Sequence, residues 1–183
     1  MGDNVILVGF MGAGKSSVGR LLARQLGRCF VETDDMITAR EGRSIPEIFA
    51  ERGEAHFRAL EEETVGLLAL KSGDVIATGG GLFCREGRPE ALRGLGTVVW
   101  LGGDFDVLYE RARRAGERPM LAGKSRDEVE ALYRSREPFY RRADLIVDTT
   151  ALNPDQVARE IARALRERAK PLPSGERVTG PRS

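Results

Sequence analysis

The sequence has few of the residues that build metal centres and covalent catalytic triads. His56 is the only histidine, so neither a histidine-based zinc site nor a Ser-His-Asp triad can be assembled. The two cysteines, Cys29 and Cys84, form no CxxC motif and no cluster with histidine. We therefore expect two buried, reduced thiols, as is usual for proteins of the cytoplasm.

The chain also lacks an excess of charge of either sign. Its 29 Lys and Arg against 28 Asp and Glu give a formal net charge of +1. Binding to nucleic acid or to an anionic membrane would need a marked basic excess on one face, so neither is predicted as a partner. Lysine is rare and the other basic residues are arginine, which makes a lone arginine weak evidence for phosphate binding without its local context.

Long hydrophobic runs are absent as well. No stretch approaches the roughly 20 apolar residues of a membrane span. The opening segment MGDNVILVGF has no basic n-region and too short an apolar run for a signal peptide, and Ile6 stands where a myristoylation signal needs Ser or Thr. We expect a cytoplasmic protein. With 183 residues, 41% of them hydrophobic and 31% charged, the chain fits one globular domain.

Short apolar runs recur along the chain between helical patterns. They do not alternate in polarity, which is typical of strands buried on both faces of a parallel sheet. The predicted strands cover residues 5–8, 29–31, 75–77, 98–101 and 145–147. Strands that alternate with helices indicate one α/β domain with right-handed crossovers.

Capping residues mark where several of the intervening helices begin and end. A helix over residues 16–27 is expected to stop at Gly27. Capping boxes open two others, Ser44 with Glu47 for residues 44–53 and Ser125 with Glu128 for residues 125–143. Further helices are predicted over residues 54–73 and from Asn153 onward. We place the domain at residues 1–168 and expect the Pro- and Gly-rich tail, 169–183, to be disordered.

The strongest motif follows the first predicted strand. GFMGAGKSS, residues 9–17, fits G-x-x-x-x-G-K-[ST] between a strand and a helix. Backbone N–H groups and the helix N-terminus there would face an anion, contributed by Gly12, Ala13, Gly14, Lys15, Ser16 and Ser17. Lys15 would bridge the β- and γ-phosphates, and the Ser16 hydroxyl would be a direct Mg²⁺ ligand. The sequence thus predicts a nucleoside triphosphate site.

The kind of nucleotide enzyme is narrowed by two further absences. No N-K-x-D guanine-recognition motif is present, which argues against a GTPase, and the chain is too short for a motor or transporter ATPase. Small P-loop proteins of this length are most often kinases for a metabolite or a nucleotide.

Several later motifs narrow the choice further. The phosphate loop is followed, in this order, by VETDDMI, SIPEIFAERGEAHFRALEEE, VIATGGGLF, ERPML, RSREPFY and NPDQV. In these motifs the chain from Asn4 to about Arg168 resembles shikimate kinases. The resemblance implies a three-layer α/β/α P-loop kinase fold with a five-stranded parallel sheet and a mobile lid at about residues 113–124. It also implies ATP- and Mg²⁺-dependent phosphorylation of the 3-hydroxyl of shikimate, a step of aromatic amino-acid biosynthesis.

The same resemblance assigns the acceptor side. Shikimate carries one carboxylate and three hydroxyls, so its pocket needs fixed cations and a carboxylate that faces a hydroxyl. Asp34 would accept the proton of the reacting hydroxyl, while Lys15 and Arg118 would neutralise the transferring phosphoryl group. The remaining substrate contacts would come from Phe49, Phe57, Arg58, Gly79, Gly80, Gly81 and Arg136.

Plainer interpretations of these residues remain open at this point. Arg58 could be a surface arginine paired with Glu61 or Glu62 at i+3 or i+4. Phe49 and Phe57 could be ordinary helix core residues, and the three glycines a flexible loop.

Two positions depart from the family pattern. Arg111, Asn153 and Pro154 resemble adenine-side contacts, but Leu152 stands where the family often has a basic residue. Glu32 replaces the usual aspartate near Mg²⁺. Since Mg²⁺ demands tight octahedral geometry, we expect the longer Glu32 side chain to act through water. Asp35 is expected to be solvated in the first turn of the following helix.

Other functions are possible on the sequence alone. A kinase for another hydroxylated metabolite such as gluconate, a nucleoside monophosphate kinase and a catalytically inactive nucleotide-binding relative would all carry the phosphate loop. No apolar heptad calls for a partner chain, so a monomer is expected.

Overall fold

A computed structural model describes residues 3–114 and 123–169, which form a five-stranded sheet and helices on both of its sides. All paired strands are parallel, in the order β2-β3-β1-β4-β5. The predicted α/β fold is therefore confirmed. The strands are β1 Asn4–Val8, β2 Phe30–Glu32, β3 Val75–Ala77, β4 Gly96–Gly102 and β5 Leu145–Asp148.

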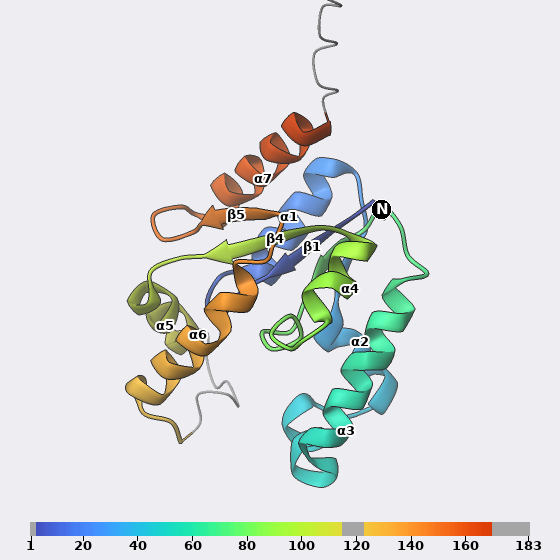
Figure 1. The fold of residues 1–183 in the computed structure, drawn as a ribbon, viewed down its shortest axis with the longest axis vertical. Helices are drawn as coiled ribbons and strands as arrows, with labels where there is room; N and C mark the ends of the chain where they lie inside the picture. Colours follow the sequence, from blue (N-terminus) through green and yellow to red (C-terminus); the bar gives the residue numbers. More distant parts are fainter. Residues whose placement is uncertain (1–2, 115–122, 170–183) are drawn as a thin grey trace, which may run out of the picture.

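The helices follow the strands along the chain. They are α1 Lys15–Leu26, α2 Thr33–Glu41, α3 Ile45–Leu68, α4 Arg88–Leu95, α5 Phe105–Arg114, α6 Arg126–Tyr140 and α7 Pro154–Ala169. Figure 1 shows α1 and α7 together on one side of the sheet and α4 and α6 on the other. No helix among the described residues is both long and apolar enough to traverse a membrane.

The central strand β1 carries the main core. Every residue of β1 is buried, and Ile6 stands in register with Ile76 of β3 on one side and Val98 of β4 on the other. A strand with neighbours on both sides and helices on both faces buries all its side chains, which explains its unbroken apolar sequence. A smaller apolar cluster, Ile37, Ile48, Phe57 and Leu60, joins α2 to α3.

The predicted caps are present. Gly27 adopts a left-handed conformation with φ of 65° and ends α1, and both capping boxes form at the starts of α3 and α6. The two helices that we predicted over residues 44–53 and 54–73 are present within α3, which is broken by non-helical backbone at Gly53, where φ is 76° and ψ is 175°; the second of them ends earlier than predicted, at Leu68. Helix α4 was not predicted, because its eight residues include Pro89 and Gly94, which are poor helix formers.

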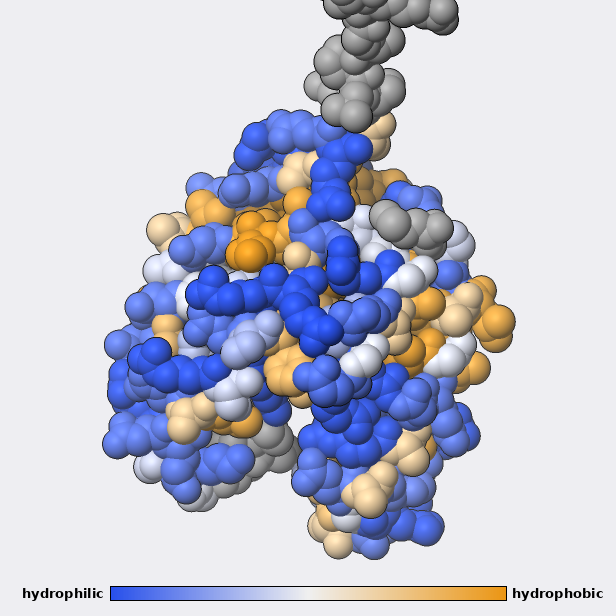
Figure 2. Space-filling model, viewed as in Figure 1, coloured by the Kyte–Doolittle hydropathy of each residue, from blue (hydrophilic) through white to orange (hydrophobic). Residues whose placement is uncertain are grey.

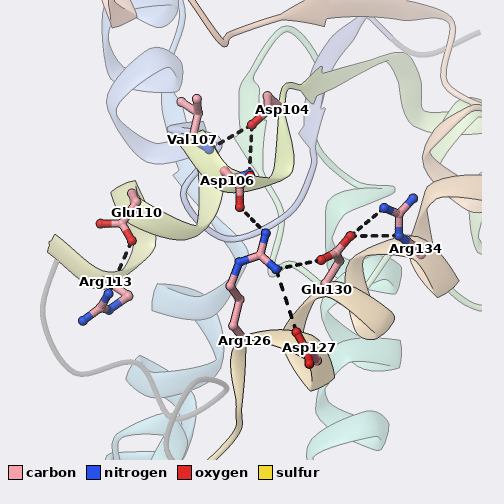
Figure 3. A network of polar contacts seen from close by, with 9 residues as sticks. All are labelled: Asp104, Asp106, Val107, Glu110, Arg113, Arg126, Asp127, Glu130 and Arg134. Atoms are coloured by element: carbon pink, nitrogen blue, oxygen red, sulfur yellow. Dashed lines mark hydrogen bonds and ion pairs between the residues drawn. The ribbon is translucent and has the colours of Figure 1, made fainter.

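Charged side chains connect α5 to α6 (Figure 3). Arg126 pairs with Asp106 of α5 and, within its own helix, with Glu130 at 3.1 Å. Glu130 also accepts a hydrogen bond of 3.1 Å from Arg134 Nε. The Arg126–Asp106 pair therefore joins α5 to α6, while the two pairs of Glu130 lie within α6.

Some expectations fall outside the described residues, and others need correction. Most of the predicted lid, including Arg118, and residues 170–183 of the predicted tail lie outside the described part. Ala169, which we assigned to the tail, is the last residue of α7. The prediction of two buried thiols is wrong for Cys29, which is exposed because it precedes the edge strand β2; Cys84 is partly buried, and both are free thiols.

Candidate active site

The loop between β1 and α1 has the geometry of a phosphate-binding loop. Gly14, with φ of 84°, lies directly before α1, and the ammonium of Lys15 turns back to donate hydrogen bonds to the carbonyls of Gly9 at 2.7 Å and Phe10 at 3.1 Å. The N-terminus of α1 and the Lys15 charge therefore lie at the carboxyl end of the central strand, a favourable place for an anion.

Gly12 is the most constrained position of this loop. Its φ is 81°, and a Cβ there would lie only 2.0 Å from the carbonyl oxygen of Leu108 in α5. At Gly14 φ is similar, but the nearest atom to a Cβ would be 3.8 Å away.

Gly12→Ala should therefore destabilise the protein more than Gly14→Ala. The left-handed backbone alone costs about 1–2 kcal/mol for a residue with a Cβ, and Gly12→Ala adds a clash with backbone. Urea unfolding of both variants measures the difference. Equal losses of unfolding free energy would show that α5 moves aside at no cost.

Ser16 and Glu32 form an oxygen-rich site beside the loop. The Ser16 hydroxyl donates a short hydrogen bond to Glu32 Oε1, and Arg20 Nη2 lies 3.4 Å from Glu32 Oε2. Glu32 is the last residue of β2, so its side chain reaches the start of α1 from a different strand. A pocket lined by Gly12, Gly14, Lys15, Ser16, Ser17, Glu32 and Arg111 surrounds these groups.

A second pocket adjoins this site between α5, α7 and the phosphate loop. Arg111 donates hydrogen bonds to the carbonyls of Thr149 at 3.0 Å and Thr150 at 3.1 Å, which ties α5 to the turn before α7. Asn153 and Gln156 cap α7 reciprocally, so the Asn153 side chain is engaged with the helix. The pocket is lined by Gly12, Ala13, Gly14, Val18, Arg111, Thr149, Thr150, Ala151, Leu152, Asn153, Pro154 and Val157.

A third pocket lies between α3, α6 and the turn after β3. Figure 2 shows the molecule hollowed at the lower edge of that view, between the lobe of α2 and α3 and the lobe of α5 and α6. The pocket is lined by Met11, Lys15, Ile45, Phe49, Phe57, Arg58, Glu61, Gly79, Gly80, Gly81 and Arg136. Lys15 lines both this pocket and the phosphate-loop pocket, so the two sites meet at one ammonium group.

Two arginines converge on the glycine turn of the third pocket. A Cβ at Gly81 would lie 3.2 Å from Arg136 Nη2 and 3.5 Å from Arg58 Nη1. Two guanidinium groups directed at one place repel each other and favour an anion between them. Arg58 is also ion-paired within α3, to Glu54 and to Glu61, so the plainer interpretation of a helix ion pair is correct too.

Phe57 belongs both to the apolar core of α2 and α3 and to the lining of the third pocket. Phe57 is buried in the cluster of α2 and α3, yet it lines the pocket together with Phe49. The two ring centroids are 4.6 Å apart.

Asp34 lies behind Gly79 in the first turn of α2. A Cβ at Gly79 would come within 2.5 Å of Asp34 Oδ1, so a larger residue there would displace the Asp34 carboxylate. The Thr33 hydroxyl accepts a hydrogen bond of 2.9 Å from Gly79 N–H and so ties the turn to α2. Burial raises the pKa of Asp34 to about 6; Lys15 opposes that rise, and the charges of Glu32, Glu61 and Asp35 add to it. Asp35 itself is exposed in the same turn, as predicted.

Sequence reasoning missed four residues around the pocket, Met11, Thr33, Ile45 and Glu61. Glu61 is the clearest case, because its side chain is only 3% exposed and its Oε2 lies 2.7 Å from Arg58 Nη1. Its position could have been found from helical spacing: in the run of Glu61, Glu62 and Glu63, it is the one that follows Phe57 and Arg58 by a helical turn.

Comparison with known families agrees with this geometry. The family model described as shikimate kinase matches residues 11–166 of the chain. The chain belongs to the shikimate kinase family. A shikimate kinase of Moorella thermoacetica is 44% identical over 166 residues, which cover 91% of this chain and 96% of that protein.

Solved structures of shikimate kinases have the same fold. The enzyme from Acinetobacter baumannii, solved in complex with shikimate, has a TM-score of 0.86 and 34% identity, with 91% of this chain and 94% of that one covered. The enzyme from Aquifex aeolicus has a TM-score of 0.81 and 40% identity, with coverages of 91% and 98%. Residues 11–17 of the phosphate loop and all the lining residues of the third pocket lie inside the region that the family model matches.

Proposed function

We propose that the protein transfers the γ-phosphoryl group of ATP to the 3-hydroxyl of shikimate, giving shikimate 3-phosphate and ADP. The observation that carries this proposal is the position of Lys15, which lines both the phosphate-loop pocket and the pocket of Arg58 and Arg136. A donor phosphate and an acceptor that carries a carboxylate would then meet at one cation. The family membership of the chain supports the same reaction.

Asp34 would orient the acceptor hydroxyl and take its proton. It lies next to the pocket behind Gly79, and its pKa of about 6 leaves it mainly ionised at neutral pH yet basic enough to receive a proton. Lys15 would neutralise charge on the transferring group. Arg118 is assigned the same task from the sequence and lies outside the described residues.

Arg58 and Arg136 would bind the shikimate carboxylate. They converge at Gly81 from α3 and α6, and their planar donor sets match the two oxygens of a carboxylate. Phe49 and Phe57 would contact the ring of shikimate, while Gly79, Gly80 and Gly81 would let the ligand approach the backbone closely.

The oxygen atoms of Ser16 and Glu32 suit Mg²⁺, which prefers hard oxygen ligands and retains several waters. No cluster of three or more His, Cys, Asp or Glu that could enclose a metal occurs within residues 3–114 and 123–169. This fits an ion held mainly by phosphates and water, with Ser16 as a direct ligand and Glu32 acting through water. When bound, Mg²⁺ would neutralise phosphate charge.

The residues that would contact ATP line the two pockets beside the phosphate loop. Arg111, Leu152, Asn153 and Pro154 would surround the adenine side of ATP, and the backbone from Gly12 to Ser17 would hold its phosphates. The proposal needs no protein partner, and we expect a cytoplasmic monomer.

Coupled measurement of ADP release tests the proposed function. Purified protein with ATP and Mg²⁺ is assayed with shikimate, gluconate and nucleoside monophosphates in turn. Of these acceptors, only shikimate is expected to give rapid turnover. Faster turnover with gluconate or a nucleoside monophosphate would identify another kinase, and ATP binding without any acceptor-dependent turnover would indicate an inactive relative.

Glu32→Asp should retain activity within about threefold of the parent, because a water-mediated contact can absorb the loss of one methylene. Glu32→Ala should lose about 10–100-fold, the usual effect of removing a group that orients metal-bound water. Steady-state rates as a function of Mg²⁺ concentration measure both effects. A loss with Glu32→Asp as large as that with Glu32→Ala would instead make Glu32 a direct ligand.

A further inference from the structure

The carbonyl oxygen of Gly80 receives two side-chain hydrogen bonds from α6. The Tyr140 hydroxyl donates to it at 2.6 Å, and Arg136 Nη1 donates at 3.2 Å. Arg136 and Tyr140 are four residues apart, so they project from the same face of the helix. The Cys84 thiol, a weak donor, also lies 3.9 Å from this oxygen, so the two donors of α6 make its short hydrogen bonds.

Tyr140 is rigidly held. Its side chain is fully buried, and its ring lies against Trp100 of β4 at 5.8 Å between centroids and against Phe83 at 6.5 Å. Burial raises the pKa of Tyr140 well above its usual value, so the hydroxyl keeps its proton at any working pH. The sheet therefore determines where this donor lies, and the donor determines where the Gly80 carbonyl points.

The direction of that carbonyl determines the direction of the next amide. Gly80 C=O and Gly81 N–H belong to one planar peptide unit and point in opposite directions. With the carbonyl held toward α6, Gly81 N–H points away from α6. Neither Gly80 N–H nor Gly81 N–H makes a hydrogen bond with any described residue, and both glycines line the pocket.

Because both residues of this peptide unit are glycines, its orientation depends on the hydrogen bonds to the Gly80 carbonyl. A peptide unit between two glycines has more accessible orientations than any other, and these would place the amide differently relative to the pocket. The nearby Thr33 hydroxyl holds only Gly79 N–H, one peptide unit earlier. If Arg136 alone held the Gly80 carbonyl, its guanidinium would be less available to the substrate carboxylate that we assign to it.

We infer that Tyr140 is a positioning residue for the acceptor site: its hydroxyl holds the Gly80–Gly81 peptide in the orientation that receives shikimate and leaves Arg136 available to the substrate carboxylate. The inference rests on the proposed function. Tyr140 touches no reacting atom; it acts through Gly80 and Arg136.

Tyr140→Phe removes this hydroxyl and keeps the ring. Loss of one well-formed hydrogen bond in the site should raise the KM for shikimate about tenfold, with the KM for ATP within twofold and kcat within about threefold. A merely structural role would instead lower the stability without separating the two KM values.

Tyr133→Phe is the matched control. Tyr133 is a buried tyrosine of the same helix, 9% exposed, whose hydroxyl also donates to a glycine carbonyl, that of Gly103 at 3.1 Å. It lines none of the three pockets described above. Both variants should lower the urea midpoint by similar amounts, but Tyr133→Phe should leave both KM values unchanged.

A second measurement needs no substrate. In ¹H–¹⁵N spectra of the free protein, Tyr140→Phe should shift the Gly81 amide resonance, and Tyr133→Phe should not. An unchanged shikimate KM in Tyr140→Phe, or an equal rise in Tyr133→Phe, would overturn the inference while wild-type turnover keeps the proposed function intact. A wild-type protein without shikimate-dependent turnover would remove both.

Discussion

Asp34→Asn is expected to lower kcat by about 10²–10⁴-fold, the range for loss of a general base. The amide cannot take the proton of the acceptor hydroxyl, yet it occupies the same space behind Gly79. The Kd for ATP should stay within about twofold, since Asp34 lines neither of the two pockets at the phosphate loop and α7. Single-turnover rates and nucleotide titrations measure the two effects separately.

Asp35→Asn is the control for this variant, because Asp35 is the exposed carboxylate of the same helical turn. Its kcat should equal that of the parent. Near-normal turnover of Asp34→Asn would exclude the assigned role. In the parent enzyme, kcat/KM should fall as the pH drops below about 6, where Asp34 becomes protonated and can no longer accept a proton.

Asp34→Asn should also stabilise the fold. The folded-state pKa of Asp34, about 6, exceeds its usual value of 3.8, so the folded protein binds the additional proton between these pH values. Stability is therefore lost as the pH rises from about 4 to 6, and the cost of burying the ionised carboxylate is fully present above pH 6. Asp34→Asn should recover up to about 3 kcal/mol of unfolding free energy at pH 8 and little at pH 4. Urea unfolding of both proteins at the two pH values measures this difference.

Arg136→Ala is expected to raise the KM for shikimate by about 100-fold or more. Removing one partner of a close charge pair in a binding site typically costs about 2–5 kcal/mol, and the variant also loses one of the two donors to the Gly80 carbonyl. The KM for ATP should change by less than about threefold, because Arg136 lines neither nucleotide-side pocket. Initial-rate measurements with each substrate varied in turn give both constants.

Arg134→Ala provides the comparison for Arg136→Ala. Arg134 lies two residues earlier on α6, its side chain is 70% exposed, and it pairs with Glu130 at the surface (Figure 3). Both KM values should be unchanged in this variant, since such a pair contributes little. An unaltered shikimate KM in Arg136→Ala, or equal effects on both substrates, would rule out the carboxylate assignment.

Local signals predicted the elements well where one residue type is physically required. Gly27 had to end α1 because only glycine readily adopts its left-handed backbone, and the serines of the two capping boxes opened α3 and α6 as expected. Predictions that depended on burial were less successful. Cys29 is exposed although cysteine is usually buried, because it lies directly before β2 at the edge of the sheet, and strand order cannot be found from a local apolar run.

The sequence by itself determined the phosphate loop, the parallel α/β architecture and the family, because each depends on residue types at short, fixed spacings. Only the tertiary structure decided how residues far apart in the chain act together. Arg58 and Arg136 converge on Gly81, Asp34 lies behind Gly79, and Tyr140 holds Gly80. Each of these side chains is separated from its glycine by 23 to 60 residues of sequence. The reason is geometric: the site forms where the carboxyl ends of parallel strands meet helices from distant segments, and their order in the sheet decides which side chains share a pocket.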